Sequence, residues 1–131
     1  MNGNGPAPSS LDTLPKLLLR NAARDADRPA MRHKDYGIWQ TWTWEQLRDE
    51  VCAFAIGLRK LGLARGDVVA IIGDNRPRLY WAMAAAQSLG GVPVPLYQDA
   101  IANEMVYVFE DRKSTRLNSS HRSLSRMPSS A

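Results

Sequence analysis

The sequence predicts an α/β protein, and three observations lead to that prediction. Residues 68–72 are five consecutive apolar residues without polar alternation, which is typical of a strand covered on both faces of a parallel sheet. A helical stretch and a second short β-prone stretch, residues 92–95, follow this strand. Upstream, two β-prone segments precede a helix with a clear apolar stripe. We therefore expect a β-hairpin, a long helix and the start of a parallel sheet covered by helices.

The first predicted helix starts after Thr13, whose hydroxyl can cap free amides, and Pro15 suits its first turn. Apolar residues follow at helical spacing, and the helix should end before Pro29. Residues 29–34 and 38–42 are short β-prone segments joined by Asp35-Tyr36-Gly37. This pattern predicts a β-hairpin.

The second helix carries the clearest start and stop signals in the chain. Thr43 and Gln46 have capping-box spacing, and Gly62 predicts a left-handed stop with Leu63 folding back onto the last turn. The apolar stripe between these signals consists of Leu47, Val51, Phe54, Leu58 and Leu61.

A strand–helix–strand unit is predicted next, with a right-handed crossover. Gly66-Asp67 turns into the strand 68–72, and Asn75 or Asp74 is expected to cap a helix that runs to about Leu89. Gly90-Gly91 ends that helix before the strand 92–95. A last helix, starting at Asp99 or Asn103, would carry Met105, Val106 and Phe109.

The charge of the chain is concentrated in residues 111–131. The whole sequence has 17 Lys and Arg against 13 Asp and Glu, a net charge of +4. Residues 111–131 hold five of these basic residues and one acidic residue, which leaves twelve of each sign in the remainder. The remainder therefore gives no argument for a nucleic-acid partner.

The same Ser- and Arg-rich segment has no hydrophobic pattern. Residues 111–121 and 125–131 can be back-translated into two parts of a short-read sequencing adapter, with residues 122–124 covering its variable index. We therefore expect residues 111–131 to be an artefactual, disordered tail. The alternative is a basic tail that binds RNA, because this composition favours disorder and phosphate contact.

Three further features of the sequence bear on where in the cell the protein is located. Residues 1–10 lack the charged start and apolar core of a signal peptide and predict a flexible leader. Cys52 is the single cysteine, so no intrachain disulfide framework exists, and a reducing cytoplasm is the expected location. No apolar run approaches the roughly 18 residues of a membrane span.

The loop 73–77 is the first candidate site, because it follows a parallel strand and precedes a helix, where α/β proteins often bind phosphates. It has one glycine and neither dinucleotide nor P-loop spacing, and Asp74 would repel a phosphate. Helix capping is the preferred interpretation. Arg76 and Arg78 could hold an anion, but a solvated helix start is preferred.

Three further candidates also have structural interpretations. His33 lacks partners at metal-ligand spacing and fits a surface position at a strand end. Cys52 lies beside the apolar stripe and fits an inert small hydrophobe better than a reactive thiol. The aromatic residues Tyr36, Trp39, Trp42 and Trp44 could stack bases, but packing of the hairpin against the following helix is preferred.

Three runs of residues carry a family resemblance: KDYGIWQTWTW at 34–44, GDVVAIIGDNRP at 66–77 and AAAQSLGGVPVPLY at 84–97. Their order and spacing resemble the amino-terminal region of bacterial acyl-CoA synthetases in the adenylate-forming (AMP-binding) superfamily, most closely the long-chain fatty-acid ligases. The resemblance covers about residues 11–110. It implies an incomplete amino-terminal subdomain, with residues 11–110 as a partial AMP-binding domain.

The resemblance also implies an activity for the parent enzyme. Such ligases form an acyl-adenylate from a fatty acid and ATP with Mg²⁺, and then transfer the acyl group to coenzyme A. Their phosphate loop, magnesium-binding glutamate, ribose-binding aspartate and mobile lysine would all follow Glu110, so no catalytic, cofactor-binding or metal residue is assigned here. The fragment is expected to be inactive, to expose apolar surface and to need no nucleic acid. Peripheral membrane association of the parent is an open option.

Two competing functions come from other classes. One is a small α/β nucleotide- or RNA-binding module that uses the loop 73–77 and the basic tail. The other is a non-catalytic regulatory domain derived from the ligase family.

Overall fold

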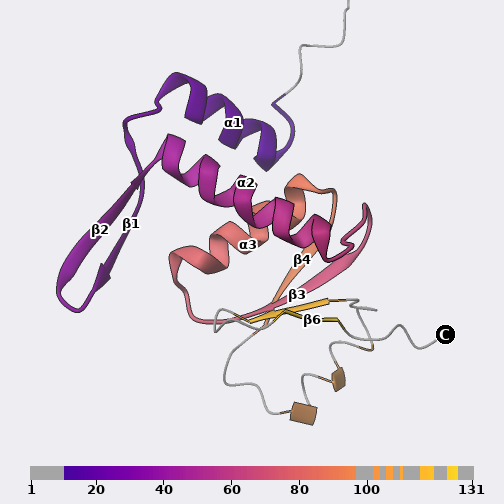
Figure 1. The fold of residues 1–131 in the computed structure, drawn as a ribbon. Coiled ribbons are helices and arrows are strands. Elements are labelled where there is room, and N and C mark those ends of the chain that lie inside the picture. The colour runs from indigo at the N-terminus through magenta and orange to yellow at the C-terminus, as the bar shows by residue number, and fades with distance from the viewer. Residues whose placement is uncertain are drawn as a thin grey trace, which may run out of the picture. The chain divides into compact units, whose positions relative to one another are not determined.

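The computed structural model describes residues 11–96, residues 102–103, 106–107 and 110, and the backbone of 116–119 and 124–126. Helices and strands are interspersed along the chain, which confirms the α/β class (Figure 1). In chain order they are α1 (Leu14–Arg24), β1 (Pro29–Asp35), β2 (Ile38–Thr43), α2 (Trp44–Lys60), β3 (Val68–Ile72), α3 (Pro77–Ser88), β4 (Val92–Leu96), β5 (Arg116–Ser119) and β6 (Leu124–Arg126). The chain divides into two compact units, 1–49 and 50–131.

The first unit begins with α1, whose start is capped as predicted. The Thr13 hydroxyl accepts a hydrogen bond from the Lys16 amide at 3.4 Å, and a proline occupies the first turn. The helix ends at Arg24, with Asp25 as its carboxyl-terminal cap residue. The predicted helix therefore forms and stops before Pro29.

The predicted hairpin also forms in this unit. β1 and β2 pair antiparallel, and Asp35 pairs with Ile38 across the turn. The two turn residues, Tyr36 and Gly37, have φ angles of 48° and 79°. Two left-handed residues in a two-residue loop match the right-handed twist of the flanking strands, and glycine adopts this conformation without strain.

Both end signals of α2 are confirmed. The Thr43 amide donates to Gln46 Oε1 at 3.0 Å, and the Gln46 amide donates to Thr43 Oγ1 at 3.2 Å. At the other end Gly62 has φ 89°, and the Leu63 amide returns to the Leu58 carbonyl at 3.1 Å. Both of these leucines are buried, and a hydrophobic contact of this kind often accompanies such a helix stop.

The apolar stripe of α2 is shorter than predicted. Val51, Ala55 and Leu58 are buried, whereas Leu61 is 48% exposed. The helix ends at Lys60, so the left-handed stop turns the chain before Leu61 can complete the stripe. Leu63 takes the buried place instead.

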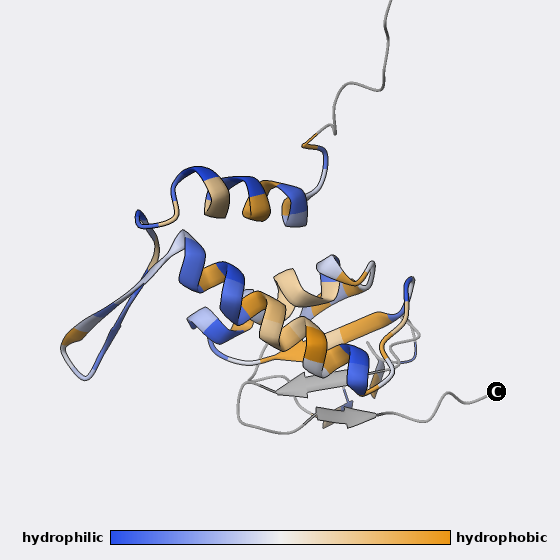
Figure 2. Ribbon diagram, turned by 45° about the horizontal axis from the view of Figure 1, so that its top comes forward, coloured by the Kyte–Doolittle hydropathy of each residue, from blue (hydrophilic) through white to orange (hydrophobic). Residues whose placement is uncertain are grey.

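The second unit contains the predicted parallel strands. β3 and β4 pair parallel and in register from Val68 opposite Val92 to Ile72 opposite Leu96. α3 contacts both strands (Figure 1). The three central residues of β3 are at most 1% exposed, which confirms that both faces of this strand are covered. Figure 2 shows the apolar colour concentrated on this strand and on the helices beside it.

α3 presents small side chains along its buried side. Its buried residues are Pro77, Trp81, Ala82, Ala85 and Ala86. It ends at Ser88, and Gly90 follows in the left-handed conformation with φ 76°. The Gly91 amide then donates to the Ala86 carbonyl at 2.9 Å, so the predicted Gly90-Gly91 stop is confirmed.

The segment 111–131 differs in two places from the disordered tail expected from its composition. β5 pairs parallel with β3, and β6 pairs antiparallel with β5, which gives the strand order β4-β3-β5-β6. The free edge of β3 offers backbone donors and acceptors, and pairing along such an edge makes little demand on side-chain pattern. The hydrophobic pattern of the sequence therefore could not predict β5 and β6.

The remaining predictions concern segments that are described only in part. Residues 102–103, 106–107 and 110 are helical, in agreement with a helix in this region. Met105, Phe109 and the leader 1–10 lie outside the described residues. Within the part of the chain that the structure describes, no helix is long and apolar enough to span a bilayer.

Candidate functional site at the carboxyl end of β3

The loop 73–76 leaves the sheet at the edge where parallel α/β proteins place their ligands. Because β3 and β4 run parallel and in register, their last residues, Ile72 and Leu96, lie side by side. The loop passes directly from that edge into α3. Ligands of open α/β sheets bind outside such carboxyl ends. The predicted location of the loop is therefore confirmed, while residues 97–101, which follow β4 in the sequence, lie outside the described residues.

The prediction that Asp74 or Asn75 caps α3 is wrong. Pro77 is the first residue of the helix, and Arg76 is the cap residue, with an extended backbone at φ −119° and ψ 164°. Its side chain makes no capping hydrogen bond. Proline favours the first helical position and forces the preceding residue out of the helical region. Pro77 was therefore the sequence signal that fixes the start, and both polar residues come too early to cap.

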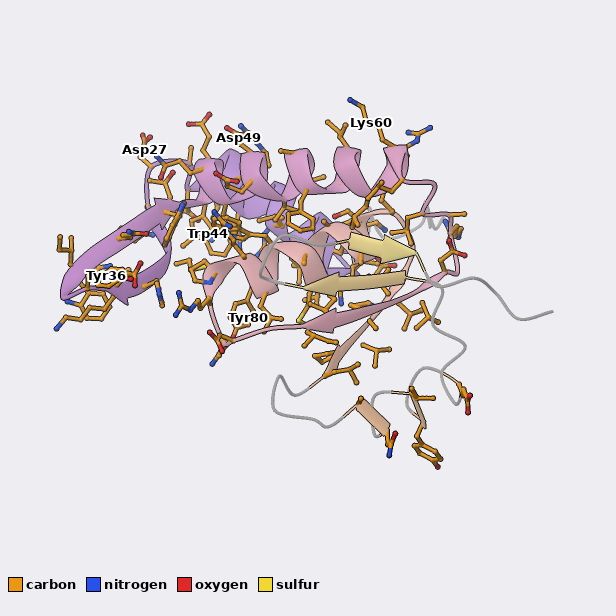
Figure 3. The ribbon with its side chains drawn as sticks, turned by 60° about the horizontal axis from the view of Figure 1, so that its bottom comes forward. Asp27, Tyr36, Trp44, Asp49, Lys60 and Tyr80 are labelled. Atoms are coloured by element: carbon orange, nitrogen blue, oxygen red, sulfur yellow. The ribbon has the colours of Figure 1, made fainter. Side chains whose placement is uncertain are left out.

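The polar side chains of the loop bind one another instead. Asp74 Oδ2 lies 3.3 Å from Arg76 Nε, and the Arg76 amide donates to the Asp74 carbonyl at 2.7 Å. The Asn75 side-chain carbonyl accepts a hydrogen bond from the Tyr80 hydroxyl. Figure 3 shows Tyr80 on the first turns of α3, at this end of the sheet.

These contacts limit what the loop can do chemically. Arg76 forms an ion pair with the Asp74 carboxylate, which partly neutralises its charge. The same carboxylate would repel a phosphate. Arg78 is exposed on the first turn of α3, as expected for a solvated helix start. The loop is therefore a self-contained connection in the described structure, and its electrostatics disfavour direct phosphate binding.

His33 and Cys52 are not brought together with other reactive groups. His33 is half-buried in β1 and pairs with Gln40 across the hairpin. Among the described residues, no group of three or more His, Cys, Asp and Glu side chains is placed to hold a metal ion. Cys52 is exposed, which contradicts its interpretation as a small hydrophobe, while the inertness of its thiol stays a prediction. Cys52 directly follows Val51 in the helix, and a step of one residue turns the side-chain direction by about 100°, away from the buried stripe.

The four aromatic residues of the hairpin region do not form one cluster. Trp39 and Trp42 are an odd number of residues apart in β2, so they lie on opposite faces. Tyr36 is 97% exposed and Trp39 is 64% exposed, which contradicts the predicted packing of these two residues against the helix. Trp42 and Trp44 are half-buried. Lys34 Nζ lies 5.8 Å from the centre of the Trp39 ring, within the range of a cation–π contact.

Two groups of the first unit have shifted pKa values, and neither belongs to the loop. The hydrogen bond from Arg24 lowers the pKa of the Asp25 carboxyl below its ordinary value, with a smaller contribution from Arg28. The hydrogen bond to Asp49 raises the pKa of the Arg48 guanidinium. Both shifts come from neighbours in the sequence, at the carboxyl end of α1 and in the first turns of α2. They therefore reflect local ion pairs and not a catalytic site.

The comparisons with known proteins agree with this arrangement. The profile of the AMP-binding enzyme family matches residues 18–126. Uncharacterized protein Rv1549 of Mycobacterium tuberculosis is 33% identical over 99 residues, which are 76% of this chain and 55% of that protein. Long-chain-fatty-acid–CoA ligase FadD15 of Mycobacterium bovis is 27% identical over 117 residues, 86% of this chain and 19% of the ligase.

A solved structure shows the same fold. The N-terminal subdomain of Klebsiella oxytoca NpsA, in complex with anthranilyl-AMSN, matches with a TM-score of 0.76 and 26% identity. The match covers 82% of this chain and 27% of NpsA's. The chain thus spans about half of the first curated relative and smaller shares of the other two. Sequence profile and fold agree, and the chain belongs to the AMP-binding enzyme family.

Proposed function

We propose that this chain is the amino-terminal scaffold of a long-chain fatty-acid–CoA ligase and is inactive by itself. The observation that carries the proposal is the alignment with FadD15, which includes 86% of this chain but only 19% of the ligase. In the parent enzyme, a fatty acid would be activated with ATP and Mg²⁺ and then transferred to coenzyme A. Binding of these four partners would fall to the remaining part of the enzyme, and the cytoplasm is its proposed location.

The described residues support a scaffold role in two ways. β3, α3 and β4 form the start of a parallel sheet whose carboxyl edge is the ligand side of α/β enzymes. The charged side chains of the loop at that edge, Asp74 and Arg76, pair with each other. Stabilising the charge that develops on a transferring adenylate requires cationic groups that are free to face it. These groups would therefore come from elsewhere in the parent.

A second candidate is activation of an aryl acid. The subdomain of NpsA that matches this chain was solved with an anthranilyl ligand, and its TM-score of 0.76 makes it a close structural relative. The scaffold is common to both substrate classes, so the acid would be selected by residues beyond this segment.

The test begins with the gene. The region should be amplified from source DNA across the Phe109 codon and sequenced without adapter ligation. We expect the frame to continue after Glu110 into a Ser/Thr/Gly-rich phosphate loop. A genomic sequence that encodes residues 111–131 followed by a stop codon would contradict the proposal and favour the small binding module.

The encoded protein should then be assayed for ATP–pyrophosphate exchange with palmitate and with anthranilate, followed by thioester formation with coenzyme A. Palmitate-dependent exchange supports the fatty-acid ligase, and anthranilate-dependent exchange supports the aryl-acid candidate. The 131-residue chain is the matched control and should give no exchange with either acid.

A further inference from the structure

The parallel sheet of the second unit ends at β4. In the strand order β4-β3-β5-β6, β4 pairs only with β3 among the strands that the structure describes (Figure 1). Two of its side chains, Val92 and Pro95, are exposed. An outer strand of this kind usually presents backbone amides and carbonyls that can bind a strand of another chain.

The hydrogen bonds of β4 decide which of its residues face this outer edge. The Val92 amide donates to the Asp67 carbonyl at 2.8 Å, so the backbone of Val92 faces β3. β3 and β4 are parallel and in register along the whole of β4. Successive residues of a strand direct their backbone groups to opposite sides. Val94 therefore also faces β3, whereas Pro93 and Pro95 face outward.

The outer edge of β4 offers acceptors without donors. Its two outward-facing residues are prolines, which have no amide hydrogen. The next outward-facing position toward the amino end is Gly91, whose amide donates to the Ala86 carbonyl at 2.9 Å. A strand added at this edge could donate to the carbonyls of Pro93 and Pro95, but its own carbonyls would find no donor there. Unpaired backbone carbonyls are costly once water is excluded, so such an addition is disfavoured.

The positions of the two prolines match the register of the strand. A proline at residue 92 or 94 would remove a donor to β3 and weaken the pairing that holds β4 in the sheet. At residues 93 and 95, proline costs no hydrogen bond within the sheet and removes the donors of the outer edge. The other side of β3 differs, because Ala70 and Ile72 have amides and this side pairs with β5.

We propose that Pro93 and Pro95 close the outer edge of β4, so that this sheet accepts further strands only on the side of β3 that pairs with β5. In the parent enzyme, β4 would then be an end strand of the sheet, and later parallel strands would join beyond β3. The closed edge is a property of this chain, and only its consequence for the parent rests on the proposed function.

The experiment opens the edge by Pro93→Val and Pro95→Val in the full chain. Valine favours strands and restores an amide at each position. The matched control is Pro15→Val, which adds a valine amide in the first turn of α1 and leaves β4 unchanged. Sedimentation equilibrium measures the apparent mass of each protein, and amide hydrogen exchange followed by NMR measures whether the new amides are paired.

We expect the original chain and Pro15→Val to have the mass of a monomer throughout. The double variant should approach about twice that mass near about 1 mM, because pairing of two opened edges adds only about four backbone hydrogen bonds and is weak. Its amides at residues 93 and 95 should exchange freely at about 20 μM and at least about twofold more slowly at about 1 mM. The Val94 amide, which faces β3, should be protected in every protein.

A double variant that stays monomeric up to about 1 mM would overturn the proposal, as would an equal rise in mass for Pro15→Val. Protection of the new amides in the dilute monomer would also overturn it, because another part of the chain would then cover the edge.

Far-ultraviolet circular dichroism checks that each variant folds. If the double variant does not fold, Pro95→Val alone decides, since the Pro95 side chain is exposed. Its new amide should exchange freely in the dilute protein, and protection there would contradict the closed edge. These measurements need no ligase activity, so their outcome is independent of the exchange assays with palmitate and anthranilate.

Discussion

The carboxylate of Asp25 connects the end of α1 to two arginines. Asp25 Oδ2 accepts a hydrogen bond from Arg24 Nε at 2.6 Å, and Asp25 Oδ1 lies 3.5 Å from Arg28 Nη1. The pKa of Asp25 is lowered chiefly by the hydrogen bond from Arg24. A carboxyl whose pKa falls on folding stabilises the fold above its unfolded-state pKa. That contribution is lost as the pH falls through the lower, folded-state pKa.

Replacing Arg24 should therefore raise the pKa of Asp25. In a carbon-detected NMR titration, we expect the Asp25 carboxyl to titrate below its ordinary value of 3.8 in the original chain and closer to that value in Arg24→Gln. Arg20→Gln is the matched control, because Arg20 hydrogen-bonds to Asn21 and not to Asp25. Identical titration midpoints in all three proteins would show that the ion pair does not persist in solution.

Side-chain environments were the hardest feature to predict from the sequence. Trp39 and Tyr36 are large aromatic residues, a type that favours burial. They are nevertheless exposed, because strand alternation and the turn direct them outward. Cys52 is exposed because its neighbour Val51, and not Cys52, lies on the buried stripe. Composition indicates which residues favour burial, but only the geometry of the element and its partners decides which of them achieve it.

Two glycines in and beside α2 should respond to the same substitution with opposite signs. A Cβ atom added at Gly57 would meet nothing within 4 Å, and this residue is an exposed helix-interior position. Gly57→Ala should therefore stabilise the chain by about 0.5–1 kcal/mol, because it removes backbone entropy from the unfolded state. Gly62 has φ 89°, so Gly62→Ala should cost about 1–2 kcal/mol of left-handed strain.

Urea denaturation of the two variants and the original chain, followed by circular dichroism at 222 nm, measures both effects. The midpoint should rise for Gly57→Ala and fall for Gly62→Ala, with unchanged slopes. Each variant is the other's control, since the change of side chain is the same. A rise in both would mean that the left-handed stop after α2 does not limit stability, and a fall in both would contradict the prediction for Gly57.

Local signals predicted the helices and strands where one interaction dominates. The capping box at Thr43 and Gln46 and the stops at Gly62 and Gly90 form as expected, because each depends on residues three to five positions apart. The start of α3 was mispredicted where two local rules compete, since Pro77 fixes the helix start more strongly than Asp74 or Asn75 can. β5 had no local signal, because its place depends on the distant edge of β3.

The candidate site could be located but not completed from the sequence. The carboxyl edge of β3 and β4 follows from two short strands and the helix between them. The interaction between Asp74 and Arg76, which makes this loop a poor phosphate site, requires side-chain geometry that no spacing rule supplies. The pairing of Asp74 with Arg76 agrees with the scaffold role that we propose for this chain.

Residues 111–131 contribute two separable properties to the whole chain: the net charge of +4 and the strand that pairs with β3. Removing them should abolish retention on a cation exchanger and any salt-sensitive binding to oligonucleotides. It should also leave the edge of β3 without this partner, and an unpaired strand edge promotes association between copies. We therefore expect the chain of residues 1–110 to self-associate, so that its sedimentation coefficient increases with protein concentration.

A full-length variant with reduced charge separates these two effects. Arg112→Ser, Lys113→Ser and Arg122→Ser remove most of the added charge but leave the residues of β5 and β6 unchanged. In sedimentation velocity this variant should remain monomeric while residues 1–110 associate, and on the exchanger both should elute early. Association of both would assign the effect to charge and not to the edge of β3. Association of residues 1–110 alone remains compatible with a tail of artefactual origin, because parallel pairing uses backbone groups that any extended segment can supply.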